Sequence, residues 1–535
     1  MQQLSPLLII GVIVGYFILL LGVAWWTGRS ASNRDFFTAS RESPWYLVAF
    51  GMIGTSLSGV TFISVPGTVG AAYMNPAIEQ APNMGFSYLQ MVFGYLAGYA
   101  VIALVLLPLY YRLQLTSIYT YLEGRFGRNA YKTGAGFFLV SRVIGAAFRL
   151  YLVAMVLYLF VFEAMGLPFW MVALLTIVLI WVYTFKGGIK TIVWTDTLQT
   201  LFMLIAVAWT LYELTTALDL SLATVWPTVK EAGLGQIFFF EGGWTDPNNF
   251  FKQFLAGMFI AIVMTGLDQD MMQKNLTCRT LQDAQKNVFS FSIVLVGVNF
   301  LFLVLGALLA LYAVSFQVDI QGADTLYPTI ALQYLPTGVG LLFLIGLVAA
   351  AYSSADSALT ALTTSFCVDF LGFEVGTPKK KEAMPTMSDI LETSVPSNIL
   401  DEASKDKASS IASSYNENTS LRYLVHIGFS LLLFMTIVLF WWVNDESVIV
   451  KLFKYAGYTY GPLLGLYGFG LLTKRQVQDK WVPIICLLAP VLTYFINENS
   501  AALLWGYKFS FELLLLNGFL TAVGLFIMSK AAPTD

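Results

Sequence analysis

Long apolar stretches separated by short polar connections make up most of the chain. A helix that crosses a lipid bilayer needs about 20 mostly apolar residues, and thirteen stretches approach or exceed this length. The pattern therefore predicts an all-α integral membrane protein with about 13 transmembrane helices. The predicted spans are 7–26, 45–66, 85–110, 133–162, 168–185, 192–217, 251–271, 286–314, 337–370, 421–443, 449–472, 481–496 and 512–529.

The overall composition agrees with this class. Of 535 residues, 57% are hydrophobic and 11% are charged, whereas soluble domains carry roughly 25% charged residues. So few charges cannot cover the surface of a soluble protein of this size. No basic residue precedes the first span and its apolar run is long, so we interpret it as a retained helix rather than a signal peptide.

Several other classes are excluded. A net charge of −3 gives no reason to expect a nucleic-acid partner. Three widely spaced cysteines and one histidine offer no disulfide framework, metal knuckle or histidine-based catalytic triad. The phosphate-loop motif G-x-x-x-x-G-K-[ST] is missing from the sequence. We therefore expect no enzyme activity, no organic cofactor and no obligate protein partner, and an ion gradient would drive any transport.

Basic residues are distributed unevenly between the connections. The odd-numbered connections and the C-terminal tail contain 21 Lys and Arg, and the even-numbered connections contain two, Lys230 and Lys508. Because cytoplasmic loops are enriched in Lys and Arg, this predicts a plasma (inner) membrane protein with its N-terminus outside and its C-terminus in the cytoplasm. The serine-rich connection 371–420 is then a cytoplasmic loop, which we expect to be flexible.

The second span combines helix breakers with hydroxyl groups. In the segment 49–67, glycines at 51, 54 and 59 and a proline at 66 surround Thr55, Ser56, Ser58 and Thr61. A helix broken at membrane depth frees backbone carbonyls and persists only where it lines a cavity or binds something. The alternative is close helix packing through small residues. Four hydroxyl groups favour the binding interpretation.

Another stretch, 350–365, places oxygens along one helix face. A carboxylate in the middle of a hydroxyl ladder suits a hard monovalent cation such as sodium better than calcium, which usually takes more carboxylates. The alternative is that the hydroxyls bond the carbonyls of their own helix, but that does not account for an aspartate at this depth. The residues on the shared face are Ser353, Asp356, Ser357, Thr360 and Thr364.

Ionisable side chains inside other spans are also functional candidates. Asp196 needs a cation or a basic partner, with a salt bridge to an interfacial lysine as the alternative. Arg142 and Arg149 lie seven residues apart and therefore share a face. Arg142 can reach the interface by snorkelling, whereas Arg149 is deeper. Its guanidinium suits a carboxylate, either on the protein, from Asp196 or Asp356, or on a solute.

Four further polar residues carry weaker signals. Gln90 lies inside the third span and faces either a cavity or a neighbouring backbone. Asp268 and Asp270 lie at the inner end of span 251–271, where an interfacial position is expected. Tyr455 belongs to an interrupted aromatic segment that either gates or forms an interfacial belt.

At several of these positions the chain resembles the sodium:solute symporter family. The segment GGIKTIVWTDTLQ at 187–199 resembles that family's signature after the fourth core helix. LTSIYTYLEGRF at 115–126 resembles its segment between the second and third core helices, and GLDQ at 266–269 and SSADS at 353–357 fit as well. The similarity runs from about residue 10 to 370 and resumes at 421–475.

This resemblance implies a five-plus-five inverted-repeat (LeuT-like) transporter core, with one N-terminal and two C-terminal extra helices. The first helix of each repeat is broken at the membrane midplane. The implied divisions are an N-terminal helix and connection, the first repeat, an extracellular loop, the second repeat and the C-terminal accessory helices: 1–44, 45–217, 218–250, 251–472 and 473–535.

The resemblance also implies the site residues. The sodium site shared by the family would use Gly54, Leu57, Ala350, Ser353 and Ser354. A second sodium site, as in relatives similar to sialic acid transporters, would use Asp196, Ser353, Asp356 and Ser357. The solute contacts would come from Ser56, Ser58, Thr61, Gln90, Arg149 and Tyr455. Val60 cannot form a hydrogen bond at a position where sugar-carrying relatives have a polar side chain, which makes a hexose a poor fit.

The leading hypothesis is a symporter that imports a small organic solute, with sodium as coupling ion and the lipid bilayer as its environment. A carboxylate-bearing solute fits Arg149. One alternative is a neutral solute such as a sugar, polyol or vitamin-like compound, with Arg149 paired internally. A membrane sensor or a channel is a more distant alternative, because no signalling domain accompanies the spans.

Overall fold

The computed structural model describes residues 6–28, 43–69, 84–113, 115, 117–373, 419–443 and 448–530. Within them, the only sheet is a two-stranded one, β1 (Gln476–Val477) and β2 (Ser529–Lys530), which pair antiparallel. The α-helices are α1 (Pro6–Gly28), α3 (Trp45–Ser56), α4 (Gly59–Val69), α6 (Tyr88–Val101), α7 (Leu107–Arg112), α8 (Thr120–Arg125), α9 (Arg128–Leu157), α10 (Phe169–Ala217), α11 (Leu222–Glu231), α12 (Phe250–Ala261), α13 (Gln269–Asn275), α14 (Leu281–Ser315), α15 (Leu326–Thr329), α16 (Thr337–Ser365), α19 (Thr419–Val443), α20 (Val448–Leu472), α21 (Val482–Glu498), α22 (Ser500–Leu503) and α23 (Leu513–Ile527).

Several of these helices continue through, or are flanked by, turns of a different helical type. The π-helical turns are η2 (Ile102–Leu106), η3 (Tyr158–Phe162), η6 (Ile262–Gly266), η8 (Ile330–Tyr334) and η9 (Phe366–Phe370). The 3₁₀ turns are η4 (Glu163–Met165), η5 (Gly243–Thr245), η7 (Ala323–Thr325) and η11 (Asp479–Trp481). The π-helical turns η2, η3, η6 and η9 extend α6, α9, α12 and α16, respectively, beyond their α-helical bounds.

Every predicted span falls on helix. By length and composition, 8 helices of the described chain could cross a membrane, or 10 if each of two bent pairs counts as one span. Two shorter apolar helices, Phe169–Val182 and Leu513–Ile527, add to these. The bounds of α10 cover the two spans predicted at 168–185 and 192–217. The number thirteen therefore stays a prediction.

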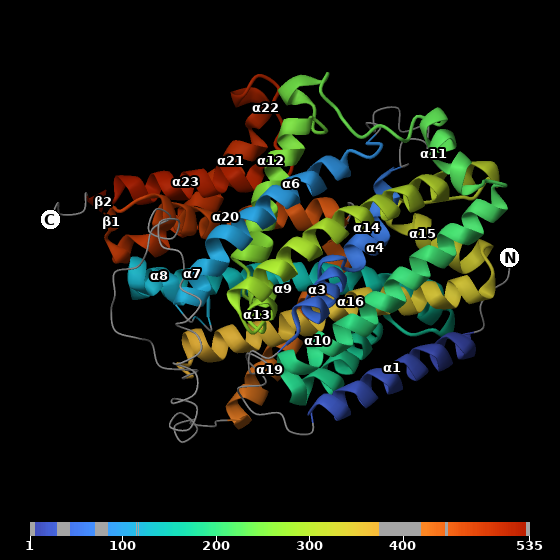
Figure 1. Cartoon of the computed structure of the whole chain (residues 1–535), viewed down its shortest axis with the longest axis horizontal. Helices are drawn as coiled ribbons and strands as arrows, with labels where there is room; N and C mark the ends of the chain where they lie inside the picture. Colours follow the sequence, from blue (N-terminus) through green and yellow to red (C-terminus); the bar gives the residue numbers. More distant parts are fainter. Residues whose placement is uncertain are drawn as a thin grey trace.

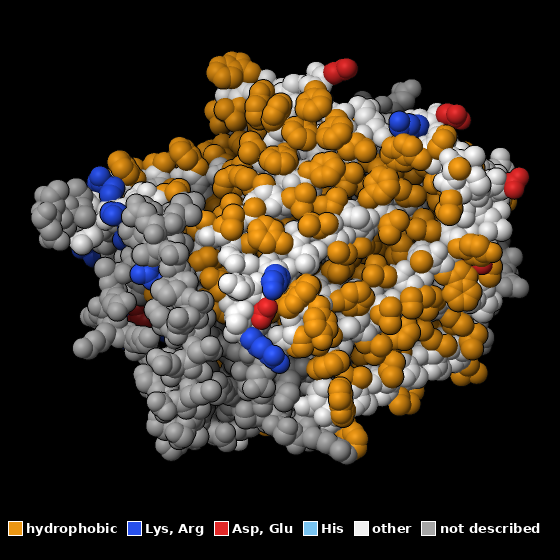
Figure 2. Space-filling view, in the orientation of Figure 1, with side chains coloured by type: hydrophobic (Ala, Val, Ile, Leu, Met, Phe, Trp, Pro, Cys, Tyr) orange, Lys and Arg blue, Asp and Glu red, His pale blue; other side chains and the backbone are white. Residues whose placement is uncertain are grey.

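The face seen in Figure 2 is largely apolar, with few charged side chains, which lie at its rims and in one small cluster near the lower middle. Peripheral helices such as α1 and α19 bury little of their apolar surface, whereas most of α16 is buried. Large hydrophobic side chains such as Leu7 and Trp442 are largely exposed. This is the surface that lipid solvates, because water could not cover it without a cost.

Figure 1 shows how the helices are arranged along the long axis of the molecule. Helix α16 is packed against α10, α9 and α3 in the interior, and α1 covers α10 at the lower edge of the view. The C-terminal helices α21 and α23 lie against α20 at the upper left. Helix α1 begins at the right-hand end of this view, and β2 lies at the left.

Helices α6 and α12 approach each other until their backbones touch. A Cβ atom placed on Gly94 would lie 2.1 Å from the carbonyl oxygen of Phe254, and one placed on Gly257 would lie 2.0 Å from that of Met91. Neither position can hold a larger residue unless the helices separate.

Two helices are broken in the interior. The axes of α3 and α4 differ by 56° across Leu57 and Ser58, and those of Phe250–Gly266 and α13 differ by 71° across Leu267 and Asp268. The first break was expected from the glycines and hydroxyls, and the second from the family resemblance alone. Most of the serine-rich loop predicted at 371–420 lies outside the described residues.

Candidate functional site

The break between α3 and α4 leaves backbone carbonyls available. The amide of Leu57 closes the last turn of α3 on the carbonyl of Ile53, and the amide of Phe62 bonds the carbonyl of Ser58 in the next helix. Because the last four carbonyls of a helix lack an intrahelical partner, those of Gly54 and Leu57 lie at the break. This is where the predicted sodium site requires main-chain oxygens.

Helix α16 brings two hydroxyls to this break. Ser353 Oγ lies 3.3 Å from Thr55 Oγ1, and Ser354 Oγ donates to the carbonyl of Thr55 at 3.2 Å. Both serines are fully buried, and Ala350 lies one turn earlier on the same helix. The structure therefore joins Ser353 and Ser354 of α16 to the end of α3 at Thr55, which follows Gly54 in the chain, and Leu57 lies in the break itself.

The rest of the hydroxyl ladder behaves differently. Ser357 Oγ donates to the carbonyl of Ser353 at 2.9 Å, and Thr364 Oγ1 donates to that of Thr360 at 2.9 Å. Asp356 Oδ1 accepts the amide of Ser357 at 2.6 Å. Bonding to the same helix, the alternative considered from the sequence, thus applies to Ser357 and Thr364, while Ser353 and Ser354 reach other helices.

Asp196, which is fully buried on α10, joins the same cluster. Its Oδ1 accepts from Ser353 Oγ at 2.6 Å, and its Oδ2 accepts from Thr55 Oγ1 at 3.1 Å and from Lys274 Nζ at 2.5 Å. The expected basic partner exists, but it is a buried lysine on α13 rather than an interfacial one. Sequence reasoning placed Lys274 among the loop charges, since only the bend after η6 turns it inward.

The prediction that Asp268 and Asp270 are interfacial is wrong. They are 0% and 1% exposed, because the 71° bend folds the start of α13 back into the protein. Asp268 caps α13 and accepts the hydroxyl of Tyr460 at 2.5 Å. Arg142 is 2% exposed and forms ion pairs with both carboxylates, so it does not reach the interface by snorkelling.

Arg149 lies two turns after Arg142 on the same face of α9 and is 9% exposed. In the described part of the chain no carboxylate forms an ion pair with it, and its Nε has no hydrogen-bond partner. Neither Asp196 nor Asp356 is its partner there. The guanidinium is therefore available to a ligand.

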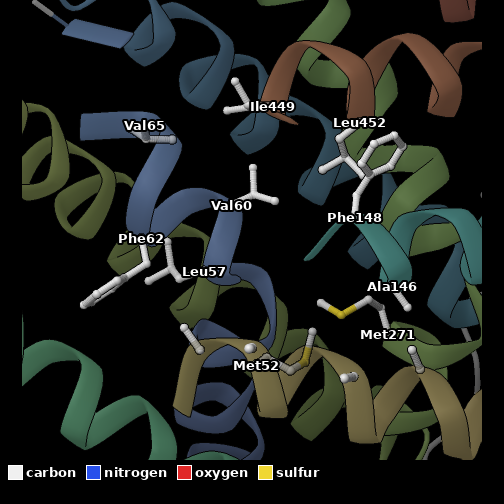
Figure 3. Packing of buried hydrophobic residues seen from close by; sticks show 14 of the residues in the cluster. Met52, Leu57, Val60, Phe62, Val65, Ala146, Phe148, Met271, Ile449 and Leu452 are labelled. Atoms are coloured by element: carbon white, nitrogen blue, oxygen red, sulfur yellow. The ribbon is translucent and has the colours of Figure 1, made fainter. Parts of the chain in front are cut away.

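A cavity of about 90 Å³ lies beside the α3 break. In Figure 3, Val60 of α4 points toward Ile449 and Leu452 of α20 across this region. No acidic side chain lines this cavity among the residues that the structure describes. The polar lining consists of two arginines, hydroxyls of the break, three tyrosines of α6 and two further polar side chains: Arg142, Arg149, Thr55, Ser56, Ser58, Thr61, Tyr88, Tyr95, Tyr99, Thr265 and Asn299.

Two predicted solute contacts lie elsewhere. The side chain of Gln90 donates to the carbonyl of Asn248 at 2.8 Å and accepts the amide of Phe239, which anchors the 218–250 connection. Tyr455 is 41% exposed and lies against Phe148 outside the cavity lining. The α6 tyrosines were missed, because aromatic residues at helical spacing are more often core than ligand-binding.

A family model described as the sodium:solute symporter family matches residues 36–388. The chain belongs to the sodium:solute symporter family. The symporter is 26% identical to the sodium/sialic acid symporter NanT of Aliivibrio fischeri over 66% of this chain and 67% of that protein. It is 27% identical to the human sodium/iodide cotransporter over 51% of this chain and 41% of that protein. It is 22% identical to human sodium-coupled monocarboxylate transporter 1 over 69% of this chain and 58% of that protein.

Solved structures share the fold of this symporter along almost its whole length. A substrate-bound, outward-open Na⁺-coupled sialic acid symporter superposes with a TM-score of 0.75 at 18% identity, covering 98% of this chain and 99% of the other. The nucleobase-cation-symport-1 family transporter Mhp1 gives 0.51 at 11% identity, covering 93% and 95%. The symporter is thus a multi-pass membrane protein with the LeuT-like fold, and a sodium-coupled transporter rather than an enzyme.

Proposed function

We propose that this symporter imports a small solute that carries a carboxylate, with Arg149 as the group that binds it. The observation that carries the proposal is the buried Arg149 guanidinium, which lines a cavity without acidic side chains and has no acidic partner in the described chain. Burying an unpaired positive charge costs free energy, and a bound anion would offset that cost. Several relatives are named for acids, sialic acid and monocarboxylates, which agrees with this choice.

The hydroxyls of Ser56, Ser58 and Thr61 would orient the solute, and Val60 leaves no hydrogen bond for a hexose at its position. We propose that sodium binds at Gly54, Leu57, Ala350, Ser353 and Ser354. There it would hold the broken helix against α16 and favour the outward-open state. Solute affinity then rises with sodium, because a ligand shifts an equilibrium only by its differential affinity for the two states.

Thermal stabilisation of the purified protein by a solute panel tests the proposal. We expect a small carboxylate to raise the unfolding midpoint in sodium but not in potassium. The panel contains lactate, pyruvate, sialic acid, iodide and a neutral hexose, since the relatives carry organic and inorganic anions. A response to the hexose alone would favour the neutral-solute alternative and contradict the role of Arg149.

Variants separate the anion site from the sodium site. Arg149→Ala should abolish acid uptake, and Arg149→Lys should retain part of it, because lysine keeps the charge but lacks the planar fork. Ser353→Ala or Ser354→Ala should raise the sodium concentration for half-maximal uptake several-fold. Unchanged sodium dependence in both serine variants would remove the proposed sodium site.

We also propose that the repeats extend over 45–217 and 251–472, and that the N-terminus lies outside. In this orientation the plasma (inner) membrane places the sodium gradient in the direction of import. The unequal distribution of Lys and Arg between the connections supports this topology.

A further inference from the structure

The carboxylate of Asp196 accepts three hydrogen bonds from donors of the protein. Ser353 donates to Oδ1 at 2.6 Å, and Thr55 and Lys274 donate to Oδ2 at 3.1 and 2.5 Å. These donors come from α16, α3 and α13, so three helices converge on one carboxylate of a fourth. A second sodium ion predicted at Asp196 would have to bind this carboxylate beside these three donors.

The ammonium group of Lys274 already places a positive charge against one carboxylate oxygen of Asp196, a predicted ligand of that second sodium. Besides Asp196, it donates to Thr55 Oγ1, and the residue is 1% exposed. A sodium ion bound by the same carboxylate would lie within a few ångströms of the ammonium, where two positive charges repel strongly in a poorly solvated interior. Lys274 and a sodium ion at Asp196 therefore exclude each other.

Helix α13 holds Lys274 in this position at both of its ends. Asp270 in its first turn is paired with Arg142, and Asn275 at its last residue accepts from Asn287 Nδ2 at 2.7 Å. Thr277 Oγ1 donates to the carbonyl of Lys274 at 2.7 Å. These contacts do not involve Asp196, so the position of α13 does not depend on the ion pair. The helix therefore places Lys274 beside the carboxylate of Asp196 by its own contacts.

The other predicted ligands of the second sodium do not complete a site around Asp196. Ser357 Oγ donates to the carbonyl of Ser353, and Asp356 Oδ1 accepts the amide of Ser357. Both interactions stay within α16. Ser353 is the one α16 ligand of that predicted set that bonds Asp196 in the described structure.

We propose that the Lys274 ammonium is a built-in cation that replaces the second sodium at Asp196, so that this symporter binds one sodium ion per cycle. The inference rests on the proposed function, because the remaining ion is assigned to the site at the α3 break. It specifies the coupling stoichiometry, which the fold alone leaves open.

Equilibrium binding of ²²Na⁺ to the purified full-length protein, without solute, tests this directly. We expect one ion per wild-type protein. Lys274→Met keeps the length of the side chain but removes the charge, and should bind two ions with a Hill coefficient above one. Asp196→Asn combined with Lys274→Met should return the number to one. Lys252→Met removes another buried lysine, paired with Glu512 at 3.2 Å, and should leave it at one.

Two ions bound by the wild type, or one ion bound by a folded Lys274→Met variant, would overturn the inference. If Lys274→Met does not fold, the wild type and the double variant decide: loss of an ion in the double variant would show that Asp196 is a sodium ligand. Absence of any sodium binding to the wild type would instead overturn the proposed sodium site, and the inference with it.

Discussion

At the scale of single residues, the sodium region depends on how closely α3 and α10 approach. A Cβ atom on Gly54 would lie 2.2 Å from Thr200 Oγ1. Thr200 is held there by a hydrogen bond to the carbonyl of Asp196 at 2.7 Å. Glycine at 54 therefore serves the close packing that was the alternative considered for this segment, in addition to placing a carbonyl at the break.

We expect Gly54→Ala to destabilise the protein by about 1–3 kcal/mol, the usual cost of overpacking, and to weaken sodium binding by displacing α3. The unfolding midpoint and ²²Na⁺ affinity measure both effects. Adding Thr200→Ala should recover part of the stability, because it removes the nearest atom. Gly11→Ala on α1 is the control, since nothing lies within 4 Å of its Cβ position. Equal stability of the two single variants would contradict the packing argument.

At the scale of helices, the bend before α13 determines the environment of the interior charges. It buries Asp268 and Asp270 against Arg142 and turns Lys274 toward Asp196. A straight continuation of the span 251–271 would have left these side chains at its inner end. The bend thus brings five charged groups of α9, α10 and α13 into contact with one another beside the site.

Removing Arg142 should cost far more stability than removing an exposed lysine. Arg142→Met leaves two buried carboxylates without a cation, for which a loss of about 3–5 kcal/mol is expected. Lys454→Met, at an exposed pair with Glu498 separated by 4.0 Å, should change stability by less than about 1 kcal/mol. Chemical or thermal unfolding in detergent measures both. Similar losses for the two variants would show that the buried cluster is not what holds α13.

Hydropathy and residue chemistry predicted the helices and the α3 break, because these depend on local composition. The partners could not be predicted in the same way. Lys274 and Asp196 are 78 residues apart, and their meeting depends on how helices cross. Gln90 shows the same limit: a buried amide must find partners, but its sequence does not say whether they belong to a ligand or, as here, to the 218–250 connection.

At the scale of the whole molecule, large apolar side chains cover the exterior and a smaller set of polar and charged side chains is buried among apolar ones, and α1 begins at the end of the long axis opposite to β2 (Figure 1). This arrangement fits a chain whose termini lie on opposite sides of a membrane. Because Lys274 is buried, it no longer counts among the basic residues of the predicted cytoplasmic connections. The excess of Lys and Arg in those connections over the predicted outer connections remains large.

Labelling with a membrane-impermeant maleimide on intact cells tests the orientation. The three native cysteines are buried, so the background should be low. Leu222→Cys and Trp505→Cys, at positions each 92% exposed in predicted outer connections, should react from outside. Lys480→Cys, exposed in a predicted cytoplasmic connection, should react only after permeabilisation. The reverse pattern would invert the topology.

The contact between α6 and α12 has a consequence for alternating access. With main-chain atoms of each helix against glycines of the other, neither helix can slide or tilt without steric collision. We therefore expect the two helices to move together, although α7 to α11 separate them in the sequence. Whatever rearrangement opens the cavity to one side and then the other has to hinge at other interfaces.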